Sequence, residues 1–149
     1  MNPRYLALAL LSVSLIHTLA QTPPAAKPVP QLPDVAAPKL SPDGSVNGGF
    51  QKSHDNFVAT AKKGDVGVVF LGDSITAGWN GQKDIWNTAF GKYKPANFGI
   101  GGDRTQHVLW RIQNGELDGI KPKAAVVMIG TNNSGSDPAD GIARGVTKI

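Results

Sequence analysis

The stretch that decides the fold is VVFLGDSITAGW, residues 68–79. The run from Val66 to Leu71 is apolar, rich in β-branched residues and bounded by glycine, which is typical of a strand buried on both faces of a sheet. The run stops at Gly72, whose flexibility permits a sharp turn, so Ser74 is expected at the start of a helix with a free backbone N–H. A serine there is either a nucleophile or a helix N-cap, and this stretch taken alone favours the N-cap. Position 76 is threonine where the G-x-S-x-G elbow of α/β-hydrolases has glycine.

The same order of strand, loop and helix occurs three times, after an opening amphipathic helix. Apolar residues at helical spacing predict helices over residues 50–61, 83–91 and about 108–112, with Ile85, Trp86 and Phe90 on one face of the second. Further strands are predicted at 96–100 and, as a buried strand, at 124–129. A last helix is expected to open with Asp137 as its N-cap and Pro138 in its first turn. This alternation predicts an α/β fold, with a parallel sheet and helices on both faces.

Three polar loops follow the three predicted strands: Gly72-Asp73-Ser74, Gly101-Gly102-Asp103 and Gly130-Thr131-Asn132-Asn133. Because working loops lie beyond the carboxyl ends of parallel strands, we expect the three to meet at one edge. Together they offer a hydroxyl, two candidate backbone donors and a side-chain amide, the groups that acyl transfer needs for a nucleophile and an oxyanion hole. The structural alternative for Asn132 is an Asx-turn. A nucleotide-binding domain is disfavoured, because Arg104 stands where a dinucleotide fingerprint has glycine.

These three blocks, in this order, resemble the first three sequence blocks of the SGNH (GDSL-type) hydrolases over roughly residues 50–135. The segment VLWRIQNGEL, residues 108–117, strengthens the likeness to the platelet-activating factor acetylhydrolase-like esterases of that superfamily. Ile75 stands where the GDSL name has leucine. The resemblance implies a flavodoxin-like sheet, here truncated to about three parallel strands in the order 2-1-3. It also implies ester hydrolysis through an acyl-enzyme, without a metal or cofactor.

The same resemblance assigns roles to individual residues. Ser74 would be the nucleophile, and Asp73 would support the turn. The backbone N–H groups of Ser74 and Gly102, with the side-chain amide of Asn132, would form the oxyanion hole. The family takes its catalytic Asp and His from a fourth block, D-x-x-H, which does not occur in this sequence. Residues 48–149 are therefore expected to be the N-terminal part of such a domain, inactive or only feebly active alone.

The three histidines of the sequence are poor substitutes for the missing base. His17 lies within residues 1–20, which are predicted to be a signal peptide, and His54 is expected to pack or cap on the first helix. His107 follows Asp103 by four residues rather than three. Without a base, a serine hydroxyl stays protonated at neutral pH and is a weak nucleophile.

The first 47 residues differ in composition from the rest. Arg4, the apolar stretch over 5–16 and the small residues Thr18 and Ala20 predict a signal peptide over 1–20, with an uncleaved anchor as the alternative. Seven of the eleven prolines lie within 22–42, so residues 21–47 are predicted to be a semi-rigid linker. We expect export to the periplasm or the extracellular space, with no stable membrane insertion after cleavage. The absence of cysteine fits a bacterial exported protein whose stability rests on its core.

The net charge of +4 comes from scattered basic residues, apart from Lys62-Lys63, so nucleic-acid binding has little support. The leading hypothesis is an exported esterase for a short acyl ester, such as the acetyl group of an acetylated glycan. The alternative is a non-catalytic binding module on the same scaffold. The joint presence of Ser74, Gly102 and Asn132 favours the esterase, because a binding module does not need the three together.

Overall fold

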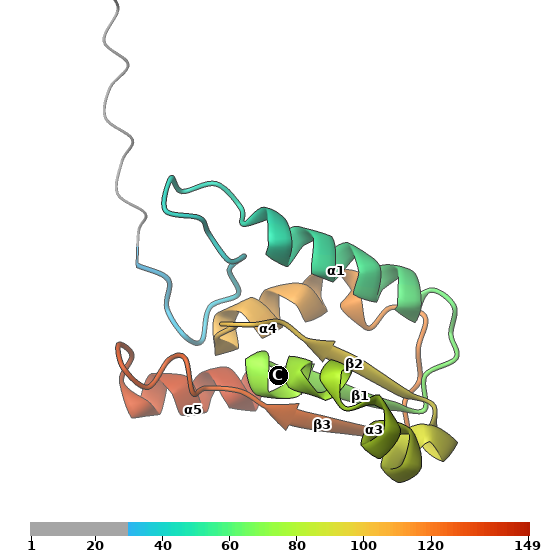
Figure 1. The fold of residues 1–149 in the computed structure, drawn as a ribbon. Helices are drawn as coiled ribbons and strands as arrows, with labels where there is room; N and C mark the ends of the chain where they lie inside the picture. The colour runs from blue at the N-terminus through green and yellow to red at the C-terminus, as the bar shows by residue number, and fades with distance from the viewer. Residues whose placement is uncertain (1–29) are drawn as a thin grey trace, which may run out of the picture.

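The computed structural model describes residues 30–149, and the predicted signal peptide and the first part of the linker lie outside this range. Helix, strand, loop and helix alternate along the chain as the sequence predicts (Figure 1). The strands are β1 (Val68–Gly72), β2 (Pro95–Gly99) and β3 (Ala124–Met128). The α-helices are α1 (Gly48–Ala61), α2 (Ser74–Ala77), α3 (Lys83–Phe90), α4 (Thr105–Arg111) and α5 (Ala139–Lys148). Short helical turns follow α2, α3 and α4: Gly78–Gly81, Gly91–Tyr93 and Ile112–Glu116.

The three strands form one parallel sheet in the order β2-β1-β3. Val68 of β1 is in register with Pro95 of β2 and with Ala124 of β3, so all three strands end together. The order confirms the prediction of a flavodoxin-like sheet with three strands. Because the strands end in register, the loops that follow them share one edge of the sheet.

Helices cover both faces of this sheet (Figure 1). On one face Val69, Leu71, Ala96 and Phe98 form the main core with α1 and α4, and Phe57 of α1 stacks on Phe98 with ring centroids 4.7 Å apart. On the other face Phe70 lies against two aromatic residues of α3, Trp86 and Phe90. Ile85 does not join this contact: it is 58 % exposed, so the prediction that it shares the apolar face of α3 is wrong.

Strand β3 forms one edge of the sheet and is exposed along its whole length. Val126, Val127 and Met128 are each more than 40 % exposed, although their apolar run predicts a buried strand. The difference arises because β1 pairs with only one side of β3. Among the described residues, nothing pairs with its other side.

Residues 30–47, which the sequence assigned to a linker, pack on the domain in the structure, and we call them the strap. The backbone of Ala37 donates to the carbonyl of Gln106 in α4, and the Thr105 hydroxyl donates to the carbonyl of the buried Pro33. Asp34 accepts from Arg144 of α5. The prolines exclude regular structure from the strap but leave its carbonyls free as acceptors. The strap is therefore part of the folded unit, ending at Asn47, the N-cap of α1.

Helix α5 begins one residue later than predicted. Its N-cap is Pro138, and the side chain of Asp137 accepts instead from the amide of Asn133, at 2.7 Å. The expectation of an Asp137 cap is thus wrong, because a tertiary partner takes that carboxylate. Over residues 30–149, no helix combines the length and the apolar character needed to cross a bilayer.

Candidate active site

The three predicted loops meet beyond the carboxyl ends of the strands, where α2 approaches the sheet very closely. A Cβ at Gly99 would lie 2.3 Å from the backbone nitrogen of Ala77 in α2. One at Gly72 would lie 2.9 Å from the Cβ of Thr76 in α2 and 2.5 Å from the carbonyl oxygen of Met128 in β3. Only glycine fits these positions, because real Cβ atoms do not approach backbone atoms below 3.0 Å. The glycines therefore allow α2, and Ser74 at its start, to sit directly on the ends of the strands.

Ser74 is the first residue of α2 and is exposed. The N-cap is Asp73, which is fully buried and whose carboxylate accepts from the backbone N–H of Ile75 at 2.9 Å. The alternative in which Ser74 caps the helix is therefore excluded. The backbone N–H of Ser74 takes part in none of the hydrogen bonds found within residues 30–149, and it lies at the positive end of the short helix.

The second loop runs beside Ser74. A Cβ built on Gly101 would lie 4.0 Å from the Cβ of Ser74. The next residue, Gly102, has a φ of +71°, which favours glycine, and its N–H is likewise absent from the hydrogen bonds within the described residues. Two backbone donors, from Ser74 and Gly102, are thus available on neighbouring loops.

The third loop holds the other two together through Asn132. Its half-buried side-chain amide donates to the Asp73 carboxylate at 3.2 Å and to the Asp103 carbonyl at 2.8 Å. The amide N–H₂ thus bridges the other two loops, and within residues 30–149 no backbone N–H donates to Oδ1 of Asn132, as an Asx-turn would require. For Asn132 to donate to an oxyanion, its amide would have to give up the longer bond, the 3.2 Å bond to the Asp73 carboxylate. The neighbouring Asn133 is fully buried and ties this loop to Thr105 and Gln106 of α4.

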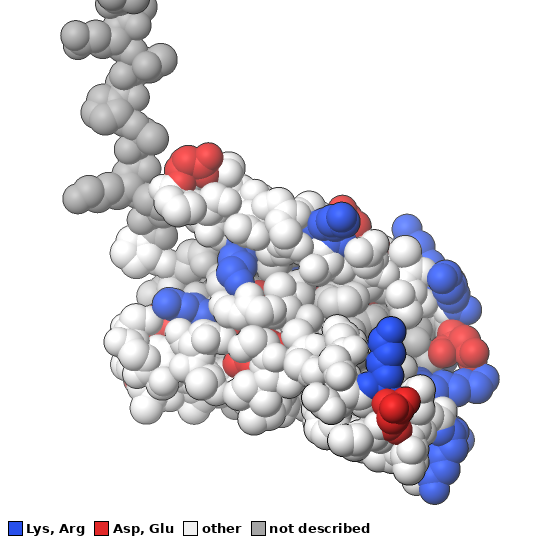
Figure 2. Space-filling model, viewed as in Figure 1, with Lys and Arg blue, Asp and Glu red and all other residues white. Residues whose placement is uncertain are grey.

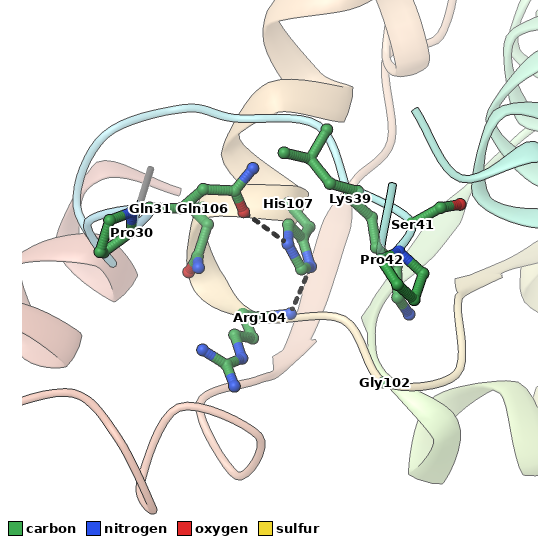
Figure 3. Close-up of a pocket in the computed structure, with 10 residues that line it drawn as sticks. Pro30, Gln31, Lys39, Ser41, Pro42, Gly102, Arg104, Gln106 and His107 are labelled. Atoms are coloured by element: carbon green, nitrogen blue, oxygen red, sulfur yellow. Dashed lines mark hydrogen bonds between the residues drawn. The ribbon is translucent and has the colours of Figure 1, made fainter. Parts of the chain in front are cut away.

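Neither described histidine hydrogen-bonds to Ser74. Nδ1 of His107 accepts from the backbone of Arg104 at 3.0 Å, and Nε2 lies 3.2 Å from the side-chain oxygen of Gln31, as the dashed lines in Figure 3 show. Burial lowers the pKa of His107 to about 3, with Lys39, Arg104 and Arg111 adding to the effect. This histidine is therefore neutral and acts as a cap of α4. His54 is buried against Trp110, as expected for a packing residue.

A buried cluster of charges lies beneath the second loop. Arg111 is fully buried and donates from Nε to Asp103 at 3.1 Å, and from Nη1 to Glu116 and to the carbonyl of Phe98. Asp103 and Glu116 are also fully buried, so two carboxylates share one guanidinium. Burial raises the pKa of Asp103 to about 7, against the opposing effects of Arg111 and Lys39.

A cavity of about 500 Å³ lies between the strap and the second loop. Gly102, Lys39, Arg104 and His107 are among its lining residues (Figure 3). Two cations thus line this cavity, whereas Figure 2 shows most Lys and Arg side chains of that view at the opposite end, around the amino ends of the strands. No group of three or more His, Asp or Glu side chains within residues 30–149 is close enough to hold a metal ion.

The structure brings together all the residues that the sequence singled out for this edge, which are Asp73, Ser74, Gly102 and Asn132. Sequence reasoning missed Lys39, which seemed to belong to a linker, and Arg111, which seemed to be an ordinary helix residue. A signal for Arg111 was available, because His107 and Arg111 lie four residues apart on one face of α4, and Asp103 precedes His107 by the same interval. No local pattern indicated Lys39.

The fold and this edge define a class of α/β protein with an exposed serine at a strand–helix turn, beside free backbone donors. A family model described as "GDSL-like Lipase/Acylhydrolase family" matches residues 70–147, just over half of the chain. The chain therefore belongs to this family, whose members hydrolyse esters.

Curated relatives agree with this assignment. Over 126 residues the chain is 43 % identical to platelet-activating factor acetylhydrolase IB subunit alpha1 of Bos taurus and, separately, of Homo sapiens. It is 41 % identical over 114 residues to the alpha2 subunit of Rattus norvegicus. These matches cover 85 %, 85 % and 76 % of this chain but 49 % of each relative. The chain thus spans about half the length of the curated relatives it matches.

Proposed function

We propose that this protein is an exported serine esterase that cleaves short acyl esters, and acetyl esters of carbohydrates in particular, through an acyl-enzyme on Ser74. The observation that carries the proposal is the exposed Ser74 at the start of α2, with Gly101 beside it and free N–H groups on Ser74 and Gly102. A tetrahedral intermediate formed at the Ser74 hydroxyl would put its negative oxygen within reach of donors on both loops. The alternative, a binding module, has no need for an exposed serine that does not cap the helix.

In this mechanism the buried Asp73 has a supporting role. Its carboxylate caps α2 and accepts from Asn132, so it fixes both the turn and the third loop. Asn132 joins the oxyanion hole when the negative oxygen replaces Asp73 as acceptor. We further propose that the Asp and His come from a D-x-x-H segment in a longer polypeptide, because His54 and His107 are both buried and neither hydrogen-bonds to Ser74. The matches cover only 49 % of each relative, and the unmatched remainder of the relatives supports this part of the proposal.

The substrate class is inferred from two features. The relatives are named as acetylhydrolases, which supports a small acyl group. The signal-peptide pattern of residues 1–20 supports export. Outside the cell, acetylated glycans are a substrate that a secreted esterase encounters. The experiment therefore compares an acetylated glycan with another acetyl ester.

The test uses the protein produced from its complete gene. Acetate release is measured from acetylated xylan and from p-nitrophenyl acetate, and the protein is labelled with a fluorophosphonate that reacts with activated serines. We expect Ser74→Ala to lower kcat by at least about a thousand-fold and to abolish labelling. The matched control is Ser134→Ala, an exposed serine on the third loop, which should keep full activity.

Two results would overturn the proposal. Activity that survives in Ser74→Ala would show that the nucleophile is elsewhere. A folded wild-type protein that neither turns over nor takes the label would favour the binding module. Turnover of the aryl ester without any release of acetate from the glycan would remove the carbohydrate part alone.

A further inference from the structure

Lys39 of the strap reaches the second loop at a position next to the proposed oxyanion donor. Its Nζ donates to the carbonyl of Gly101 at 2.5 Å and lies 3.8 Å from the Asp103 carboxylate. The Lys39 side chain is 23 % exposed, so solvent competes only partly for the ammonium. Lys39 and Gly102 line the same cavity (Figure 3). The strap thus places one cation on the turn that carries the free N–H.

The contact matters because of how a peptide unit is built. The carbonyl of Gly101 and the N–H of Gly102 belong to the same planar trans peptide, in which the two bonds point in opposite directions. A cation that holds the carbonyl therefore also fixes the direction of the N–H. It further polarises the peptide, which makes the N–H a stronger donor.

This turn needs an external restraint. Gly101 and Gly102 are consecutive glycines, the residues with the greatest backbone freedom, and Gly102 occupies the left-handed region at φ +71°. Rotation of the peptide between them would turn the N–H away without any steric penalty from side chains. Asp103, anchored by Arg111, fixes the end of the turn, and the Asp103 N–H donates to the Ile100 carbonyl at 3.1 Å. The Gly101 carbonyl has Lys39 as its side-chain partner.

We propose that Lys39 is a positioning residue of the oxyanion hole: it holds the Gly101–Gly102 peptide in the orientation that directs the Gly102 N–H toward the acyl oxygen at Ser74. The proposal rests on the proposed function. It makes the strap, outside the residues that the family model matches, a working part of the site. Lys39 touches no substrate atom and acts through the peptide.

The experiment compares three variants. Lys39→Met removes the cation and keeps most of the side-chain volume, and Lys39→Arg restores a cationic donor. The matched control is Arg144→Met. It removes the 3.1 Å ion pair between Arg144 of α5 and Asp34 of the strap but leaves the Gly101 carbonyl untouched. Each is assayed for kcat and KM on p-nitrophenyl acetate. The amide of Gly102 is followed by ¹⁵N NMR, through its chemical shift and its rate of hydrogen exchange.

We expect Lys39→Met to lower kcat by about ten- to a hundred-fold with little change in KM, less than the hundred- to thousand-fold loss of a whole oxyanion donor. The Gly102 amide should shift and exchange faster. Lys39→Arg should recover most of the rate, and Arg144→Met should leave both readouts unchanged. A Gly102 amide that does not respond to Lys39→Met overturns the proposal, as does an equal kcat loss in Arg144→Met.

The two readouts separate this proposal from the proposed function. If Ser74→Ala shows that Ser74 is not the nucleophile, the catalytic role of Lys39 falls with it, whereas the amide of Gly102 still reports whether Lys39 orients the peptide. If Ser74 is the nucleophile but Lys39→Met changes neither kcat nor the NMR signal of the Gly102 amide, only the proposal for Lys39 is wrong.

Discussion

At the scale of single residues, the least expected feature is a carboxylate buried next to the candidate active site. Asp103 is fully buried and shares Arg111 with Glu116, while Lys39 and His107 lie 3.8 Å and 3.7 Å from its Oδ1. Because His107 is neutral, it does not offset the second carboxylate. One guanidinium and one largely buried ammonium therefore face two buried negative charges, and burial raises the pKa of Asp103 from 3.8 to about 7.

This raised pKa predicts how stability depends on pH. Between about pH 4 and pH 7 the folded state binds a proton at Asp103 that the unfolded state has lost, so the free energy of unfolding falls as the pH rises. We expect a decrease on the order of a few kcal/mol across this interval, measured by urea unfolding at a series of pH values. Asp103→Asn should flatten the curve.

The control for this prediction is an aspartate with a shift of the opposite sign. The pKa of the exposed Asp140 is lowered by its hydrogen bond to Arg144, so Asp140→Asn should not reduce the fall in stability toward pH 7. If Asp103→Asn leaves the slope between pH 4 and pH 7 as it is in the wild type, Asp103 is ionised throughout and the assigned shift is wrong.

At the scale of elements, the position of α2 depends on glycines in the strands beneath it. Gly99→Ala would put a Cβ at 2.3 Å from the Ala77 nitrogen and 2.8 Å from the Thr76 carbonyl carbon. Since both contacts are with backbone, α2 has to move, carrying Ser74 with it. We expect a loss of roughly 1–3 kcal/mol or more in the free energy of unfolding, and a loss of serine labelling by the fluorophosphonate.

Gly78→Ala is the matched control, because Gly78 has φ −57° and nothing within 4 Å of its Cβ position. It should be neutral, or stabilising by about 0.4–1 kcal/mol through the unfolded chain. An equal free energy of unfolding for Gly99→Ala and Gly78→Ala would mean that the backbone of α2 does not contact β2 closely at Gly99.

The elements also show what the sequence can predict. The order of strands and helices and the three-loop edge followed from apolar periodicity and glycine positions, which are local signals. The docking of the strap did not, because Pro33, Ala37 and Lys39 bond to partners more than sixty residues away. The burial of Asp103, Arg111 and Glu116 was also not predicted, since charged residues are ordinarily exposed and their burial depends on packing. Asp137 was misassigned for the same reason, because its partner Asn133 becomes apparent only in the folded loop.

At the scale of the whole molecule, the two edges of the sheet differ. The β2 edge starts with a proline, which cannot donate to another strand, and its residues Ala96, Phe98 and Gly99 are buried. The β3 edge consists of five consecutive exposed residues, AAVVM, without a charge, proline or glycine. Such an edge can pair with another strand and is a site of aggregation when nothing covers it.

This asymmetry predicts that a polypeptide of residues 30–149 self-associates through β3. Val126 is 44 % exposed, and Val126→Lys adds a charge at the edge that opposes strand pairing. We expect sedimentation velocity to show larger species as the wild-type concentration rises, and Val126→Lys to shift them toward the monomer without lowering the urea midpoint. Leu32→Lys, an equal change in charge at a 60 % exposed site in the strap, controls for net charge alone. Equal effects of the two lysine substitutions would show that the association depends on net charge and not on β3. A wild-type chain that stays monomeric would show that the β3 edge does not pair with another strand in solution.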